Sequence, residues 1–165
     1  MIVVLRDLDY EQLKSKLDPN DRIVVWSCND CTKYCDLGGR KNLNALADAL
    51  EKDGYNILRR ELVGVSCQMN LIRERTTHRS VKEIFKDATA IIVLACTDGY
   101  LKVQRVFRKK KIIQVGVSVG LGTYSKKEGM KLVIPLEETG LEPSVEGLTL
   151  DEAAKKLKMK SGPII

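Results

Sequence analysis

The sequence predicts an α/β fold built on an open, doubly wound, mostly parallel sheet of the Rossmann or flavodoxin-like type. Short, uniformly apolar runs rich in β-branched residues alternate with segments that carry apolar residues at helical spacing. Such runs are typical of strands covered on both faces, and their alternation with amphipathic helices favours right-handed crossovers between parallel strands. At 165 residues, the chain fits a single core.

The first strand and helix of this sheet are predicted in the opening third of the chain. An apolar stretch at residues 2–5 and a helix that ends near Pro19 are predicted as a lead-in, that is, elements that precede the first strand of the sheet. Residues 23–26, Ile-Val-Val-Trp, then predict a buried strand. Apolar residues spaced three or four apart predict a helix over residues 40–52, which Gly54 ends.

The middle of the chain repeats this unit. Residues 56–65 predict a second strand, although its register is less clear than that of the first. Helical spacing resumes at residues 69–72 and again at 81–85, where Ser80 is a candidate N-cap. The clearest strand in the chain follows at residues 90–95, Ala-Ile-Ile-Val-Leu-Ala.

The last part of the chain predicts one more parallel strand and then looser structure. A helix over residues 100–107 leads to a strand at 112–117. From Ser118 onward we expect irregular structure, with a short strand at 131–135 and a small helix within 148–159. We therefore expect an α/β metal-binding domain at residues 1–135 and a partner-docking C-terminal extension at 136–165.

Composition and charge exclude several classes of function. The chain carries 28 basic and 22 acidic residues, for a net charge of +6, and its densest basic run, Arg108 to Lys111, is interpreted as a charged helix end. Aromatic residues are few and do not alternate with basic ones, so no nucleic-acid partner is indicated. No apolar run is long enough for a membrane span and no export signal opens the chain, which predicts a cytoplasmic protein.

Five cysteines are the most informative part of the composition. An odd number of cysteines, in a chain expected in the cytoplasm, favours metal or redox chemistry over a disulfide framework. Cys28, Cys67 and Cys96 each follow a predicted strand. Because the carboxyl ends of parallel strands meet at one edge of the sheet, where open α/β folds bind their ligands, we expect these thiols to converge. Cys31 and Cys35 extend the first of these positions.

Clustered thiolates repel one another unless a cation neutralises their charge. Thiolates are soft ligands, so a soft metal ion is the cation that they favour. A [4Fe-4S] cluster is favoured over Zn2+ because the later cysteines come singly instead of in the paired knuckles typical of structural zinc. Four of the five cysteines are then ligands, with Cys28 or Cys35 the spare. Two other interpretations stay open: Cys67 and Cys96 as ordinary buried residues, and a metal-free redox dithiol at Cys28 and Cys31.

Other candidate residues are weaker. The only histidine, His78, lies among basic and hydroxyl residues and is interpreted as a surface residue, and no catalytic set is predicted. Gly38 and Gly39 precede a predicted helix, where exposed backbone amides form a weak candidate cofactor-binding site. The glycines do not form the dinucleotide fingerprint, so tight turns are the preferred interpretation.

The order of these motifs resembles a known family. The pattern C-x-x-C-x-x-x-C-x-x-G-G at residues 28–39, the pair Cys67-Gln68, and Leu-Ala-Cys at 94–96 are similar to those of the methylenetetrahydrofolate reductase C-terminal-domain family. The resemblance covers about residues 1–135. Longer members continue into a cysteine-bearing tail, whereas no cysteine follows Cys96 in this chain.

The resemblance implies a small iron-sulfur or zinc subunit that works beside a flavin-containing reductase. Its five cysteine positions map onto Cys28, Cys31, Cys35, Cys67 and Cys96. The implied function is an electron-transfer subunit, without a complete active site, in a hetero-oligomeric methylene-tetrahydropterin reductase complex of one-carbon metabolism. The alternative is a zinc-stabilised structural subunit that docks a partner in the same or another redox complex.

Overall fold

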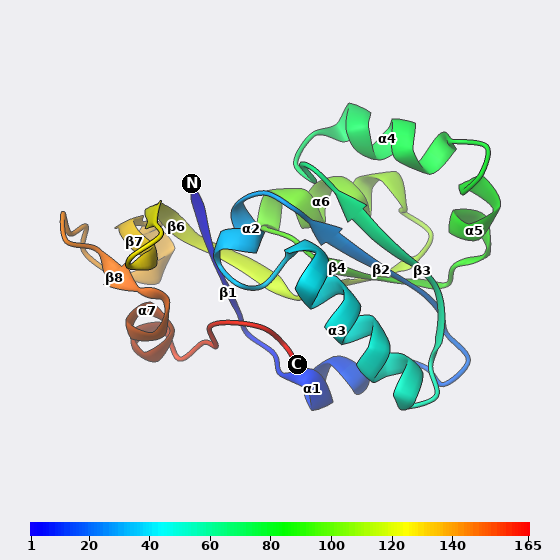
Figure 1. The fold of residues 1–165 in the computed structure, drawn as a ribbon, viewed down its shortest axis with the longest axis horizontal. Coiled ribbons are helices and arrows are strands. Elements are labelled where there is room, and N and C mark those ends of the chain that lie inside the picture. Colours follow the sequence, from blue (N-terminus) through cyan, green and yellow to red (C-terminus); the bar gives the residue numbers. More distant parts are fainter.

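The computed structural model describes residues 1–165 and contains two four-stranded sheets (Figure 1). The parallel sheet consists of β2 (Arg22–Cys28), β3 (Asn56–Val63), β4 (Ala90–Leu94) and β5 (Lys111–Gln114). The antiparallel sheet consists of β1 (Ile2–Arg6), β6 (Gly116–Ser125), β7 (Gly129–Pro135) and β8 (Leu148–Thr149). The prediction of an α/β fold with a parallel sheet is confirmed at this level.

The parallel sheet has the strand order β3-β2-β4-β5, so the direction of progression along the sheet reverses between β2 and β4. In β2, residues Ile23 to Trp26 are fully buried, as the uniformly apolar run predicts. Side chains along this strand alternate between two apolar clusters: Ile23 and Val25 join one, and Val24 and Trp26 join the other.

Helices cover both faces of the parallel sheet (Figure 1). On one face α3 (Gly39–Lys52) buries Leu43, Leu46 and Leu50 in the cluster of Ile23. On the other face, residues of α4 (Met69–Thr77), α5 (Lys82–Asp87) and α6 (Thr97–Val106) join the cluster of Trp26. Helix α5 begins after Val81, so Ser80 is not its N-cap; the Ser80 hydroxyl instead hydrogen-bonds Nδ1 of His78.

The single strand predicted at residues 112–117 is wrong. Strand β5 ends at Gln114, and β6 begins at Gly116 in the second sheet, where it pairs antiparallel with β1. A Cβ at Gly116 would lie 2.3 Å from the Ala95 carbonyl oxygen and 2.7 Å from a Val4 methyl group. The absence of a side chain therefore lets the chain cross tightly between the two sheets.

The irregular structure expected from Ser118 onward is wrong for residues 118–130, because β6 and β7 form an antiparallel pair. The short strand expected at residues 131–135 is confirmed as part of β7, and the small helix expected within 148–159 is confirmed at residues 150–157. A Cβ at Gly122 would lie 2.0 Å from the carbonyl oxygen of Lys131 on β7. The pairing register shifts between Leu121 and Gly122. The glycines that look like loop residues in the sequence thus allow two strands to approach closely at a bulge.

Residues 136–165 pack against the rest of the chain. They contain a 3-10 turn, η1 (Glu137–Thr139), and α7 (Leu150–Leu157), which begins with a capping box between Thr149 and Glu152. Lys160 forms a β-bridge with Arg6. Ile164 is buried in the same cluster as β1, so its side chain is not free to dock a partner.

The remaining short helices are α1 (Tyr10–Lys14), which corresponds to the predicted lead-in helix, and α2 (Cys31–Tyr34). None of the helices combines the length and apolar character that crossing a bilayer requires.

Candidate functional site

Three neighbouring strands of the parallel sheet lead into segments that carry cysteine. Cys28 is the last residue of the central strand β2. Cys67 follows the end of β3 by four residues, and Cys96 follows the end of β4 by two. Because β3, β2 and β4 are adjacent and parallel, all three segments leave the sheet at the same edge.

The segment after Cys28 is organised by a buried threonine. The Thr32 hydroxyl donates a hydrogen bond of 3.1 Å to the Cys28 carbonyl oxygen. The Thr32 carbonyl oxygen in turn accepts from the backbone N–H groups of Leu37 and Gly38. These bonds close a compact loop, with Cys31 half-buried at the start of α2.

Cys35 faces β1. Its Sγ accepts a hydrogen bond from the Val4 N–H at 3.4 Å and lies 3.8 Å from the Ile2 carbonyl oxygen, to which the thiol can donate. The side chain is buried in the apolar cluster that β1 shares with α3. Burial is the main reason that the pKa of Cys35 rises to about 11, with further increases from the Cys31 and Cys96 thiols and an opposing effect of the Val4 N–H.

The segment that carries Cys67 is held against β2. The indole N–H of Trp26 donates to the Ser66 hydroxyl at 3.0 Å, and both residues are fully buried. The Cys28 thiol lies 3.8 Å from the Gly64 carbonyl oxygen in the same segment. Cys67 itself is exposed, so this thiol reaches the protein surface.

Cys96 is the N-cap residue of α6, and its Sγ accepts a hydrogen bond from the Gly99 N–H at 3.4 Å. The start of this helix is tied to the second sheet by a reciprocal pair of bonds. The Thr97 N–H donates to the Ser118 hydroxyl at 3.1 Å, and the Ser118 N–H donates to Thr97 Oγ1 at 2.9 Å. Cys96 is thereby fixed where the two sheets meet.

The pKa values of Cys96 and Cys67 are raised by their surroundings at this edge. Burial raises the pKa of Cys96, and the thiols of Cys28, Cys67 and Cys31 raise it further, against a lowering by the Gly99 N–H. Burial also raises the pKa of Cys67, with smaller contributions from Asp98, Cys28 and Cys31. Charge on the neighbouring thiols therefore disfavours deprotonation of Cys67 and Cys96.

All five cysteines are free thiols. No three side chains of His, Cys, Asp or Glu lie close enough together to hold a metal ion in this arrangement. By its chemistry, a set of free thiols fits a soft metal. Coordination would require the segments that carry these thiols to close inward, and the exposed Cys67 has the most room to move.

Gly38 and Gly39, the weak candidates for cofactor binding, have a structural explanation. A Cβ at Gly38 would lie 2.3 Å from Thr32 Oγ1 and 2.5 Å from the Cys28 carbonyl oxygen. Gly39 has a φ of +83°, which favours glycine. The pair allows the cysteine loop to pack tightly before α3, while cofactor binding by these residues stays a prediction.

The residues that position the thiols were not predicted from the sequence; they are Thr32, Ser66, Thr97 and Ser118. Ser66 and Trp26 are 40 residues apart, and Ser118 and Thr97 are 21 apart. Serine and threonine near a strand end are common in loops, so the only signal was that Thr32, Ser66 and Thr97 adjoin cysteines, and Ser118 carried none. Comparison with protein-family models, curated proteins and solved structures finds no match.

Proposed function

We propose that this protein holds a [4Fe-4S] cluster on thiolates at the carboxyl edge of its parallel sheet. In this proposal it serves as the electron-transfer subunit of a methylene-tetrahydropterin reductase complex. The observation that carries the proposal is the convergence of cysteine-bearing segments from β3, β2 and β4. In doubly wound folds, ligands bind where the strand order reverses. That point lies between β2 and β4, next to Cys28 and Cys96.

The proposed ligands are Cys28, Cys31, Cys67 and Cys96. The thiols of Cys28 and Cys31 raise the pKa of both Cys67 and Cys96, and all four residues lie in the segments that leave the sheet edge. Cys35 is the proposed spare, because its sulfur is engaged by Val4 and Ile2 and is buried against β1. The sequence alone left the choice between Cys28 and Cys35 open.

A bound cluster would supply one-electron transfer, with a potential set by its surroundings. The chain's own contribution is the position of the site relative to solvent. Cys28 and Cys96 are buried, whereas Cys67 is exposed and Cys31 half-buried. One side of the site thus faces the protein interior, and the other lies where a second redox protein can approach.

The proposed partner is a flavin-containing reductase subunit in a hetero-oligomer. Exposed apolar side chains beside the cysteine loop support a docking surface there. The rings of Tyr34 on α2 and Tyr124 on β6 have centroids 4.7 Å apart, and both side chains are exposed. Leu121 and Ile134 are paired neighbours on β6 and β7 and are also exposed. Aromatic and aliphatic anchors of this kind are typical of interface centres.

The direct test is metal analysis of protein purified without oxygen. We expect about four irons and four sulfides per chain and broad absorbance near about 400 nm. Cys28→Ser, Cys31→Ser, Cys67→Ser and Cys96→Ser should each lose the cluster. Cys35→Ser is the matched control and should retain it.

One zinc per chain without sulfide would overturn the cluster and leave the zinc-stabilised structural subunit. Full metal content in Cys67→Ser or Cys96→Ser would contradict the convergence of the three segments. For the partner, copurification with a flavoprotein should be weakened by Leu121→Asp. Val145→Asp, at a fully solvent-exposed position outside this surface, is the control.

A further inference from the structure

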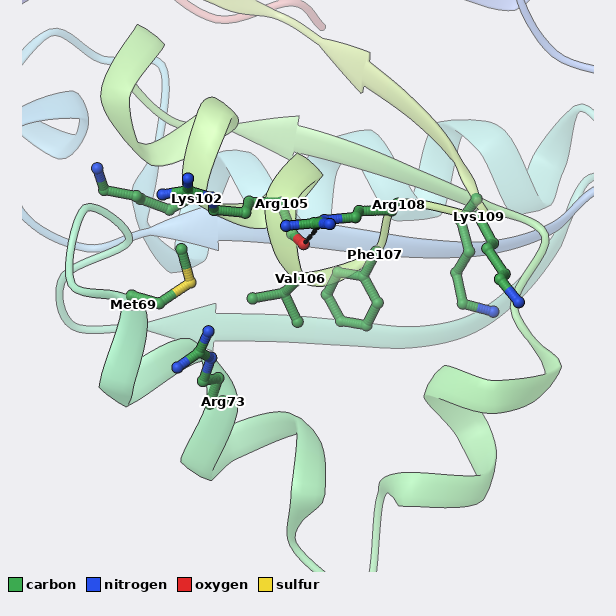
Figure 2. Close-up of a pocket in the computed structure, with 9 residues that line it drawn as sticks. Met69, Arg73, Lys102, Arg105, Val106, Phe107, Arg108 and Lys109 are labelled. Carbon is green, nitrogen blue, oxygen red and sulfur yellow. Dashed lines mark hydrogen bonds between the residues drawn. The ribbon is translucent and has the colours of Figure 1, made fainter.

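A strongly basic groove lies between α4 and α6, on the face of the parallel sheet opposite α3 (Figure 2). Its volume is about 900 Å³, which is within the range of about 300–1,000 Å³ typical of ligand sites. Six of its nine lining residues are cationic, and none is acidic: Arg73, Lys102, Arg105, Arg108, Lys109 and Lys110.

Most of this positive charge has no counter-charge within the protein. Lys102 pairs with Asp98 at 3.2 Å, and Lys110 donates to the carbonyl oxygens of Lys86 and Ala88. Arg108 donates only through Nε, to the Arg105 carbonyl oxygen. The side chains of Arg73, Arg105 and Lys109 make no hydrogen bond or ion pair. Elsewhere in the chain, basic residues form ten further ion pairs with acidic ones.

The cations converge on the groove from opposite sides. Figure 2 shows Arg73 extending from α4 toward α6, which carries Lys102 and Arg105. Like charges that face one another across a groove destabilise the fold unless an anion lies between them. Guanidinium groups suit phosphate because they can donate two parallel hydrogen bonds to its oxygens.

The groove also has an apolar part, formed by its three other lining residues, Met69, Val106 and Phe107. In Figure 2 the side chains of Val106 and Phe107 project from the end of α6 and the turn after it into the space that faces α4. The ring of Phe107 stacks on Phe85 at a centroid distance of 5.4 Å, so a second buried ring supports this part of the wall. An apolar wall beside a cationic wall suits a ligand with a planar ring and a charged tail.

We propose that the groove between α4 and α6 binds a phosphorylated ligand with two or more anionic groups and a planar ring, as a nucleoside di- or triphosphate has. The phosphates contact Arg73, Arg105 and Arg108, and the ring covers Met69 and Val106. Phosphate binding would explain most of the basic run from Arg108 to Lys111, which the sequence alone indicates as a charged helix end. Only Lys111 lies outside the groove, in an ion pair of 2.6 Å with Asp21.

The test is calorimetric titration of the full chain with ADP, pyrophosphate and adenosine at constant ionic strength. We expect ADP to bind more tightly than either fragment. The double variant Arg73→Gln/Arg105→Gln should weaken ADP binding about tenfold or more, because it removes two charge-assisted contacts with the phosphates. Both residues are exposed, so circular dichroism should show an intact fold. Lys126→Gln/Lys127→Gln, on the exposed turn between β6 and β7, removes the same charge and should not change the affinity.

Absence of ADP binding overturns the proposal, including the case in which an oligonucleotide or an acidic protein binds instead. Equal weakening in the Lys126 and Lys127 variant also overturns it, because the effect would then be one of net charge. Pyrophosphate binding as tight as ADP binding would reject the part of the proposal that concerns the ring.

Discussion

The indole Nε1 of Trp26 donates a hydrogen bond of 3.0 Å to the hydroxyl of Ser66. This bond joins the central strand β2 to the segment that places Cys67 at the sheet edge. Both side chains are fully buried, so water cannot replace either partner. The position of Cys67 therefore depends on a polar contact inside the apolar cluster that lies between the sheet and α4, α5 and α6.

Ser66→Ala should lower the free energy of unfolding by about 1–3 kcal/mol, because it leaves a buried indole N–H without an acceptor. Urea titration followed by Trp26 fluorescence measures the change. Ser144→Ala, at an exposed position where the hydroxyl makes no hydrogen bond, should change stability by less than about 0.5 kcal/mol. Equal stability of the two variants would mean that the Trp26 contact does not hold the segment.

Glu61 is fully buried on β3 and pairs with both Arg59 and Arg75, which fastens α4 to the sheet. Glu61→Gln should cost about 1–3 kcal/mol, because it removes the charge from a buried carboxylate that contacts two partly exposed arginines. Glu128→Gln, in an exposed pair with Lys131, should cost less than about 1 kcal/mol. Chemical denaturation of the two variants compares the costs, and similar values would show that the Glu61 network adds nothing beyond a surface pair.

Gly38→Ala should destabilise the protein by about 1–3 kcal/mol, because a Cβ would overlap Thr32 and the Cys28 carbonyl oxygen. The loop that carries Cys31 should then shift, and metal content should fall together with stability. Gly64→Ala is the control, since a Cβ there has no atom within 4 Å. A stable Gly38→Ala protein would show that the loop can relax around the added methyl group.

The pKa of Cys35 is raised by burial from 9.0 to about 11. Between these values the folded protein keeps a proton that the unfolded chain has lost, so the free energy of unfolding should fall as pH rises through this window. Below pH about 9 the Cys35 thiol is protonated in both the folded and the unfolded state, so its full contribution to the free energy of unfolding is present. Other groups titrate here too, so the measurement is the difference in stability between the metal-free parent and Cys35→Ala, followed against pH. A difference that does not change with pH would contradict the burial of a neutral thiol.

Whether an element could be predicted from the sequence depends on how far apart in the chain the residues that stabilise it lie. The buried strand at residues 23–26 and the helix at 40–52 were predicted well, because apolar periodicity is local and both form from their own pattern. The second sheet was missed because Gly116, Gly120 and Gly122 look like loop residues. Their role is evident only from the backbone atoms of Ala95, Ile134 and Lys131, which come from other segments of the chain and lie against these glycines.

By itself, the sequence determined the α/β class and the placement of Cys28, Cys67 and Cys96 at or after the carboxyl ends of strands, because hydrophobic alternation and strand direction are properties of short segments. Tertiary structure decided that β3, β2 and β4 are neighbours and that Cys35 faces β1. It also decided that Arg73 and Arg105 line one groove. Those relationships depend on packing and hydrogen bonds between residues far apart in the chain, and no local pattern encodes them.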